Sequence, residues 1–221
     1  LKLAFPTALA DPVATYEAPY GFVVRPACGD EEPAQKWADV SGVLADGAAA
    51  GLAVLNDSRY GYDILDGELR LSVLRTPIYC FHDPAKVDVR RRYEYTDQGL
   101  QTLKYALLPH SGDWREGDVV RQAQQLNHPC LVREGPAHSG SRRPVYGYVQ
   151  VDQAAVIVEV IKEREDGDGL VLRAYETGGT AVSATVKVEG AGSARLEFGP
   201  CEIKTLRIGR DSGVSVQISH F

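Results

Sequence analysis

Hydrophobic and polar positions alternate in several short stretches of the chain. Residues 69–74 place Leu69, Leu71 and Val73 on one face and their neighbours on the other. This period of two is typical of a strand with one buried face. Just before it lies Asp66-Gly67, and an Asp-Gly pair adopts the positive φ angles of a type I′ turn. We therefore predict a β-hairpin centred on this pair.

Similar stretches, separated by turn-forming residues, continue along the chain. Strands spaced about 8–12 residues apart indicate a sandwich. Residues 131–144 are rich in Gly, Ser, Pro and Arg and predict a linker. We expect an all-β fold of antiparallel β-sandwiches, with a larger unit over residues 1–147 and a smaller C-terminal unit over 148–221. Further strands are predicted at 51–55, 102–108, 154–161, 170–175, 182–188, 203–208 and 214–218.

One short helix is predicted among the strands. Asp113 and Glu116 have the three-residue spacing of a capping box, in which each side chain accepts the backbone N–H of the other residue. Apolar residues then recur at helical spacing. The helix is predicted over residues 114–127, with an apolar face formed by Val119, Ala123 and Leu126.

Composition and charge exclude several classes of function. The 221 residues, 44% apolar and 24% charged, suit one large or two smaller globular domains. A net charge of −6 argues against non-specific binding of nucleic acid, which needs clustered Lys and Arg. The cluster Arg90-Arg91-Arg92 is followed by acidic residues, so we interpret it as a solvated strand face. No apolar run approaches the ~20 residues of a membrane span. Neither nucleic acid nor a membrane is therefore an expected partner.

The cysteines and the missing methionine bear on the origin of the chain. Cys28, Cys80, Cys130 and Cys201 lie far apart and form no C-x-x-C pair. Metal ribbons need close pairs and disulfide frameworks are denser, so we expect reduced, buried thiols in a cytoplasmic protein. The chain contains no Met. Because a nascent chain begins with Met, we expect a processed or excised piece.

No catalytic pair of acids is predicted within the chain. A glycosidase needs two carboxylates about 5–10 Å apart across the scissile bond. The sequence contains thirty acidic residues, and no pattern singles out a pair. Four acids are expected in loops, where acids usually cap turns: Asp57, Asp63, Asp83 and Asp113.

No metal site is predicted either. His110 lies three residues before Asp113, but zinc needs three or four protein ligands in all. We expect His110 to have a structural role, in which it pins the corner formed by Gly112, Asp113 and Trp114.

Aromatic and polar residues gather in two expected loops. Residues 56–63 contain two Tyr, two Asp and one Arg, and residues 75–83 form a second such loop at a strand end. Aromatic faces bind the C–H surfaces of sugars, and charged side chains bind their hydroxyls. The same residue types often only order a turn, so both interpretations stay open.

Seven stretches of the chain have the order and the residues of one enzyme family. They are ATYE at 14–17, KWADVS at 36–41, VLNDSRYGYD at 54–63, LRLSVLRTP at 69–77, YALLPHSGDW at 105–114, EDGDGLVLR at 165–173 and EIKTLR at 202–207. In these stretches the chain resembles the C-terminal half of family 38 glycoside hydrolases, the α-mannosidases of the bacterial and cytosolic-vacuolar type.

The resemblance implies a retaining α-mannosidase assembled from an α/β barrel, a helical bundle and C-terminal β-sandwich domains. In that family the Asp nucleophile and the zinc, whose ligands include a His-x-Asp pair, belong to the barrel. This chain contains no His-x-Asp. The resemblance therefore implies an accessory β domain without catalytic residues or zinc of its own, inactive alone. Its partners would be the barrel and helical bundle of the same polypeptide and a mannoside or oligosaccharide substrate.

The resemblance also implies roles for individual residues. The candidates for the rim of the substrate pocket are Tyr60, Tyr62, Asp63, Arg75 and Asp83. The candidates for a structural corner are His110, Asp113 and Trp114. Two alternatives remain beside the accessory domain: a stand-alone carbohydrate-binding β-sandwich, and a scaffold that forms oligomers.

Overall fold

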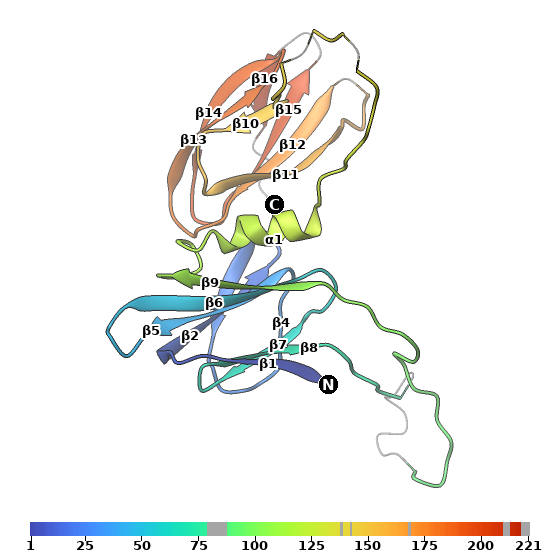
Figure 1. Ribbon diagram of the computed structural model, residues 1–221. Coiled ribbons are helices and arrows are strands. Elements are labelled where there is room, and N and C mark those ends of the chain that lie inside the picture. The colour runs from blue at the N-terminus through green and yellow to red at the C-terminus, as the bar shows by residue number, and fades with distance from the viewer. Residues whose placement is uncertain (79–87, 138, 142, 168, 210–212, 218–221) are drawn as a thin grey trace. The chain divides into compact units, whose positions relative to one another are not determined.

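The computed structural model describes residues 1–78, 88–137, 139–141, 143–167, 169–209 and, for the backbone, 213–217. The chain divides into two compact units, Leu1–Cys130 and Leu131–Phe221 (Figure 1). The division falls at the start of the predicted linker. It differs from the predicted limits, 1–147 and 148–221, because residues 131–147 belong to the second unit.

The first unit contains two antiparallel sheets in its described residues. A four-stranded sheet has the order β1-β8-β7-β4, and a five-stranded sheet has the order β3-β2-β5-β6-β9. The strands are β1 (Lys2–Pro6), β2 (Ala10–Ala18), β3 (Gly21–Arg25), β4 (Glu32–Pro33), β5 (Trp37–Val43), β6 (Ala49–Asn56), β7 (Gly61–Leu65), β8 (Glu68–Ser72) and β9 (Tyr105–Ser111).

The core of the first unit lies between these two sheets. Tyr16, Val40 and Val54 of the five-stranded sheet belong to one buried cluster with Ile64 and Leu69 of the other sheet. Their neighbours along each strand point to the opposite face, as the period of two requires. The predicted all-β sandwich is confirmed.

The predicted hairpin connects β7 and β8. Leu65 pairs with Glu68, and the two residues between them have φ angles of 50° for Asp66 and 76° for Gly67. Two consecutive positive φ angles define the type I′ turn, whose twist matches that of antiparallel strands. The turn places the side chains of β7 and β8 in register, and several of them belong to the candidate site.

The helix α1 (Val119–Asn127) covers the outer face of the five-stranded sheet (Figure 1). Val119 and Ala123 pack with Trp37, Leu55 and other residues in a second buried cluster. The predicted apolar face of the helix is confirmed. Its packing against the sheet explains why such a short helix is stable, since isolated helices of this length are marginal in water.

The predicted start of the helix, at residue 114, is wrong. The helix begins at Val119, and the preceding Asp118 has a left-handed backbone with φ of 52°. Asp113 instead accepts the backbone N–H groups of Arg115 at 2.8 Å and Glu116 at 3.4 Å. It therefore caps a separate turn, and the left-handed residue prevents this turn from joining the helix.

The second unit is also a sandwich of two antiparallel sheets in its described residues. One sheet has the order β10-β13-β14 and the other β11-β12-β15-β16. Val186 and Phe198 of the first sheet and Leu172 and Leu206 of the second belong to one buried cluster. The strands are β10 (Val149–Val151), β11 (Val156–Glu163), β12 (Leu170–Glu176), β13 (Val182–Val188), β14 (Gly192–Phe198), β15 (Ile203–Gly209) and β16 (Gly213–Gln217).

Two surface predictions need correction. The arginines at 90–92 are solvated but lie in a turn and its irregular continuation, not on a strand. The thiols are not buried: Cys28 and Cys130 are exposed and Cys201 is partly exposed, while Cys80 lies outside the described residues. Strong turn signals around these positions outweigh the preference of Cys for the interior. Among the described residues, no helix is long and apolar enough to cross a membrane.

Candidate functional site

The loop after β6 is shaped by one buried amide. The Oδ1 atom of Asn56 accepts the backbone N–H of Ser58 at 2.9 Å and that of Arg59. Its Nδ2 atom donates to the carbonyl of Gln35 at 3.1 Å and to the hydroxyl of Tyr62. An Asn that binds the backbone two residues ahead fixes a tight turn. Asn56 therefore determines the path of the chain toward residue 60.

Tyr60 projects from this loop into solvent. Its side chain is 58% exposed, whereas its carbonyl accepts the N–H of Ala34 at 3.0 Å. The neighbouring Arg59 donates from Nε to the carbonyl of Val73 at 2.7 Å, which joins the loop to the end of β8. The aromatic ring is thus presented on a backbone that is fixed on two sides.

Tyr60 and Arg75 line the same cleft, which we call the Tyr60–Arg75 cleft. It has a volume of about 550 Å³, and its other lining residues include Glu31, Glu32 and Arg59. A volume of this size is within the range of small-molecule sites, about 300–1,000 Å³. An aromatic face, two cations and two carboxylates in one cleft suit a ligand with both C–H surfaces and hydroxyl groups.

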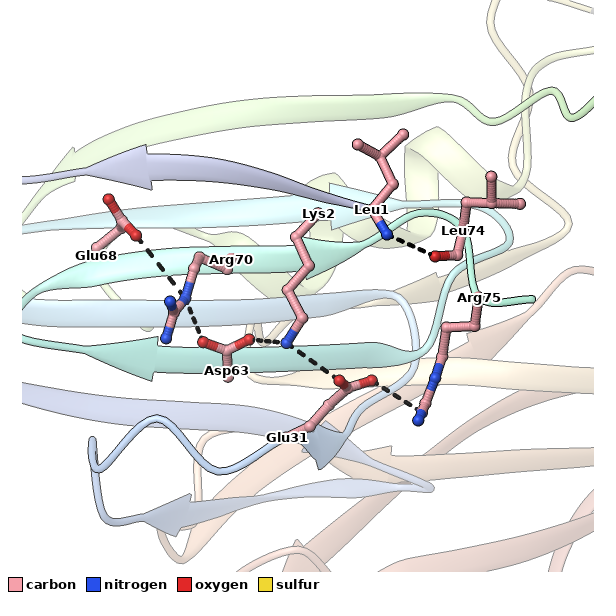
Figure 2. Close-up of polar contacts among 8 residues, drawn as sticks. All are labelled: Leu1, Lys2, Glu31, Asp63, Glu68, Arg70, Leu74 and Arg75. Atoms are coloured by element: carbon pink, nitrogen blue, oxygen red, sulfur yellow. Dashed lines mark hydrogen bonds and ion pairs between the residues drawn. The ribbon is translucent and has the colours of Figure 1, made fainter. Parts of the chain in front are cut away.

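A network of alternating charges lies beside the cleft (Figure 2). Asp63, on β7, is fully buried, and its two carboxylate oxygens bind the Lys2 ammonium and the Arg70 Nε atom. The Lys2 Nζ atom also lies 3.1 Å from Glu31 Oε2. Glu31 Oε1 in turn lies 3.2 Å from Arg75 Nη1. The network joins the buried carboxylate of Asp63 to the exposed side chain of Arg75.

Lys2 and Glu31 stay ionised over a wide pH range. Burial alone lowers the pKa of Lys2, but the hydrogen bonds to Asp63 and Glu31 outweigh it and raise that pKa above its ordinary value of 10.5. Burial alone raises the pKa of Glu31, but hydrogen bonds from Lys2 and Ser72 outweigh it and lower that pKa below 4.5. Both charges are therefore present between these two values.

The predicted rim residues separate into two groups. Tyr60 and Arg75 line the cleft. Tyr62 and Asp63 are each 0% exposed, and Asp63 lies within strand β7 rather than in a loop. Their side chains point to the core and to the charge network, so the prediction that they line a pocket rim does not fit the fold. Asp83 lies outside the described residues.

Tyr62 has a structural role. Burial strongly raises the pKa of its phenol, with smaller contributions from other groups. Its ring lies in the core of the first unit and its hydroxyl binds Asn56. Tyr60 differs because it precedes β7 and lies in the loop, whereas the side chain at 62 is within the strand and faces the core between the sheets.

His110 contacts a residue that the sequence did not single out. Its Nε2 atom lies 2.7 Å from Asp39 Oδ2, and both side chains are buried. His110 is on β9 and Asp39 is on β5, so the contact crosses the intervening β6 at Gly51. A side chain at Gly51 would overlap the imidazole ring. The pair therefore ties three strands together, and glycine at 51 is required for it.

The other two residues of the predicted corner lie beside the helix. Trp114 is buried, with its ring centroid 5.1 Å from that of Trp37 and 4.7 Å from that of Phe22. Asp113 binds Arg115 at 2.6 Å, and the Arg115 guanidinium lies 4.3 Å from the Trp114 ring. These contacts are those of packing and turn formation.

The described residues do not fit a metal ion. No three His, Cys, Asp or Glu side chains gather in the part of the chain that the structure describes. The nearest approach to a ligand pair, Asp39 with His110, is a buried hydrogen bond whose atoms already bind each other. No chemical step is therefore assigned here to a metal.

Lys2 and Glu31 are site residues that the sequence analysis missed. Lys2 begins the first strand, and Glu31 lies in a polar run before β4. Neither position has a local pattern that indicates a partner. The contact of Lys2 with Asp63 spans 61 residues of sequence. The alternation of β7 places the side chain of residue 63 on the face opposite its buried apolar neighbours. Of the patterns in the sequence, this one came nearest to indicating the contact with Lys2.

The fold and the site define an all-β region with a polar, aromatic cleft. Residues 1–86 match the profile described as "Glycosyl hydrolases family 38 C-terminal domain", and residues 155–194 match "Glycosyl hydrolases family 38 C-terminal beta sandwich domain". The chain is a C-terminal region of the family 38 glycosyl hydrolase type found in α-mannosidases.

Individual relatives agree with this family. Alpha-mannosidase 2C1 of Mus musculus is 33% identical over 193 residues, which cover 82% of this chain and 17% of that protein. Alpha-mannosidase G of Dictyostelium discoideum is 30% identical over 179 residues, 77% of this chain and 15% of that protein. The chain thus spans a small part of these relatives.

A solved structure shares the fold. An alpha-mannosidase from Enterococcus faecalis V583 superimposes with a TM-score of 0.70 at 16% identity, over 94% of this chain and 25% of that one. At this identity the likeness concerns the fold alone.

Proposed function

We propose that this chain is an accessory β region of an α-mannosidase that hydrolyses terminal α-mannosides. It packs on the catalytic barrel and helical bundle of the same polypeptide, and it lends the Tyr60–Arg75 cleft to the rim of the substrate pocket. The single observation that carries the rim role is the cleft itself, which is lined by both an exposed aromatic ring and an anchored cation. The family relationship supports the parent activity.

Bond cleavage is assigned in this proposal to the barrel and not to the present chain. The zinc that the family resemblance implies is assigned to the barrel as well. The Tyr60 ring would cover the C–H face of a mannose unit, while Arg75 would bind its hydroxyls. A cytoplasmic location for the enzyme is part of the same proposal.

The test compares the full-length enzyme with the chain alone. We expect the enzyme to release product from an aryl α-mannoside and the purified 221-residue chain to release none. Turnover by the chain alone would contradict the division of labour proposed here.

The rim role is tested in the full-length enzyme with Tyr60→Ala. We expect the KM for an α-mannobioside to rise about 5–10-fold, which corresponds to the loss of about 1 kcal/mol of stacking. Tyr148→Ala is the matched control, since Tyr148 is 43% exposed and lies in the second unit. An unchanged KM in Tyr60→Ala would remove Tyr60 from the rim.

A stand-alone carbohydrate-binding module is the second candidate. The observation in its favour is that all described lining residues of the cleft come from the first unit of this chain. It predicts heat on titration of the chain with mannose or mannan, and loss of that heat in Tyr60→Ala. Calorimetry without heat up to millimolar sugar would exclude this candidate.

A further inference from the structure

We propose that Lys2 and Glu31 are positioning residues for Arg75, and that they hold its guanidinium at the wall of the cleft ready to bind sugar hydroxyls. The inference rests on the proposed function of the Tyr60–Arg75 cleft. The charges that act together alternate in sign, in the order Arg70, Asp63, Lys2, Glu31 and Arg75 (Figure 2).

The anchor of this line is the buried carboxylate of Asp63. It lies on β7, between β8 and β4 of the four-stranded sheet, and has no exposed surface. A buried carboxylate is stable only while its cations stay in place. Lys2 cannot leave Asp63 without leaving a buried charge less compensated. Its ammonium is therefore a fixed point from which Glu31 is held.

The backbone around Lys2 reinforces the same arrangement. The carbonyl of Leu1 accepts the N–H of Val73 at 3.0 Å and that of Leu74 at 3.2 Å, and Lys2 pairs with Ser72 across the strands. Residues 73 and 74 immediately precede Arg75. The start of β1 thus holds the backbone next to Arg75, while the Lys2 side chain acts on its guanidinium through Glu31.

Glu31 has its place because residue 61 is a glycine. A Cβ atom added at Gly61 would lie 2.5 Å from Glu31 Oε1. Gly61 begins β7 directly after Tyr60, so the same backbone segment carries the aromatic ring and makes room for the carboxylate. A methyl group at this position would displace Glu31 without changing any charge.

Arg75 is exposed to solvent and is also fixed by an ion pair with Glu31. Its side chain is 72% exposed, and among the described residues Glu31 is its ion-pair partner, through one of the two terminal amino groups. The guanidinium has five N–H donors, so most remain for a ligand. A long side chain fixed before binding loses less conformational entropy when the ligand arrives. Glu31 therefore improves the affinity that Arg75 confers.

The rival explanation is that the network only stabilises the sheet edge. In that case Glu31→Gln would lower the stability of the fold and leave the Michaelis constant unchanged. If Glu31 positions Arg75, Glu31→Gln instead changes KM, and it does so only while Arg75 is present.

The experiment measures kcat and KM of the full-length enzyme on an α-mannobioside. We expect Arg75→Ala, Glu31→Gln and Gly61→Ala each to raise KM about fivefold with little change in kcat. The double variant Glu31→Gln with Arg75→Ala should be no worse than Arg75→Ala alone, because Glu31 acts through Arg75. Glu197→Gln is the control, as it removes one charge from an exposed pair, Arg195 with Glu197 at 3.8 Å.

Two kinetic results would overturn the proposal. One is a normal KM in Glu31→Gln when Arg75→Ala raises KM. The other is a double variant in which the two losses multiply, since Glu31 would then act independently of Arg75.

A second measurement separates this inference from the proposed function. In the 221-residue chain, the side-chain 15Nε NMR signal of Arg75 should show slow rotation of the guanidinium, which Glu31→Gln and Gly61→Ala make fast. Fast rotation in the wild-type chain would overturn the positioning role whatever the enzyme does. A full-length enzyme without mannosidase activity would overturn the proposed function, while the NMR result would still decide whether Glu31 holds Arg75.

Discussion

Single residues show how much of this fold depends on a few buried polar groups. Asp39, Asp63 and Glu176 are buried charged side chains, and each carboxylate is bound by named donors. Exposed ion pairs such as Arg195 with Glu197 contribute about 0–1 kcal/mol at most. A buried carboxylate that loses its donors, or donors that lose their carboxylate, costs several times more. The critical polar positions are therefore the buried ones.

Glu176 gives the first prediction at this scale. Its carboxylate accepts the backbone N–H groups of Gly178 at 2.7 Å, Gly179 at 2.8 Å and Cys201 at 2.9 Å. Glu176→Gln replaces one acceptor oxygen by a donor that faces N–H groups. We expect a loss of about 2–4 kcal/mol in the free energy of unfolding, measured by urea denaturation. The exposed Glu163→Gln serves as the control. Equal urea midpoints for wild type and Glu176→Gln would refute the expectation.

The Asp39–His110 pair predicts a pH dependence of stability. Burial alone lowers the pKa of His110, but the hydrogen bond and the charge of Asp39 outweigh it and raise the pKa above 6.5. Because the folded-state pKa lies above the unfolded one, the stabilisation is fully present below pH 6.5 and is lost as the pH rises through the folded value.

Asp39→Asn tests this dependence through urea midpoints between pH 5 and pH 9. We expect the variant to be less stable than wild type at every pH, with the difference largest at the acidic end, where the imidazolium and the carboxylate attract each other. His128→Asn is the control, because His128 is exposed. A difference that does not vary with pH would show that the charge of His110 plays no part.

At the scale of elements, local backbone geometry decides where the turns lie and where the helix begins, and packing stabilises the helix. The β7–β8 hairpin forms where Asp66-Gly67 allows positive φ angles. The helix, in contrast, begins only at Val119, after the left-handed backbone of Asp118, although the predicted capping residues lie earlier. A turn of five residues can satisfy Asp113 without a helix, so the capping signal did not determine the boundary.

Val119→Ala tests the contribution of helix packing. Val119 is fully buried in the cluster that joins α1 to the five-stranded sheet. Removing two methyl groups should cost about 2 kcal/mol in the free energy of unfolding, from lost burial and the residual cavity. Gln125→Ala, on the exposed side of the same helix, should leave it unchanged within about 0.5 kcal/mol. Equal free energies of unfolding in Val119→Ala and Gln125→Ala would show that the burial of Val119 does not stabilise the fold.

The whole molecule consists of two sandwiches, each with its own core. The buried cluster between the sheets of the first unit and the cluster of the second unit share no residue. Such cores are expected to respond separately when a side chain within one of them is shortened. Each core is thus built from side chains of its own unit.

Hydrogen exchange can test the two cores. Leu71→Ala and Leu206→Ala each remove a fully buried side chain, one from each core, and should cost about 2–5 kcal/mol locally. We expect amide exchange to accelerate most in the strands that share the altered core, around β7 and β8 for Leu71 and around β12 and β15 for Leu206. Equal acceleration in all strands for both variants would show that the chain unfolds as one cooperative unit.

The sequence by itself determined the class of fold, the hairpin, the apolar face of the helix and the family. These features depend on local backbone preferences and on patterns that repeat within a few residues, such as the alternation around Leu69 or the Asp66-Gly67 pair. It also indicated Tyr60 and Arg75, but it treated Tyr62 and Asp63 as their equals.

Only the tertiary structure decided which of these side chains reach solvent. Tyr62 and Asp63 lie two and three residues after Tyr60, yet both are buried. Tyr62 belongs to the core between the sheets, whereas Asp63 is covered by partners on its own sheet, among them Lys2 from 61 residues away. Asp39 likewise meets His110 across a distance of 71 residues. Contacts at such separations depend on the register and packing of whole sheets, which no short stretch of sequence contains. The residues that fix the side chains of the site therefore lie far from them along the chain.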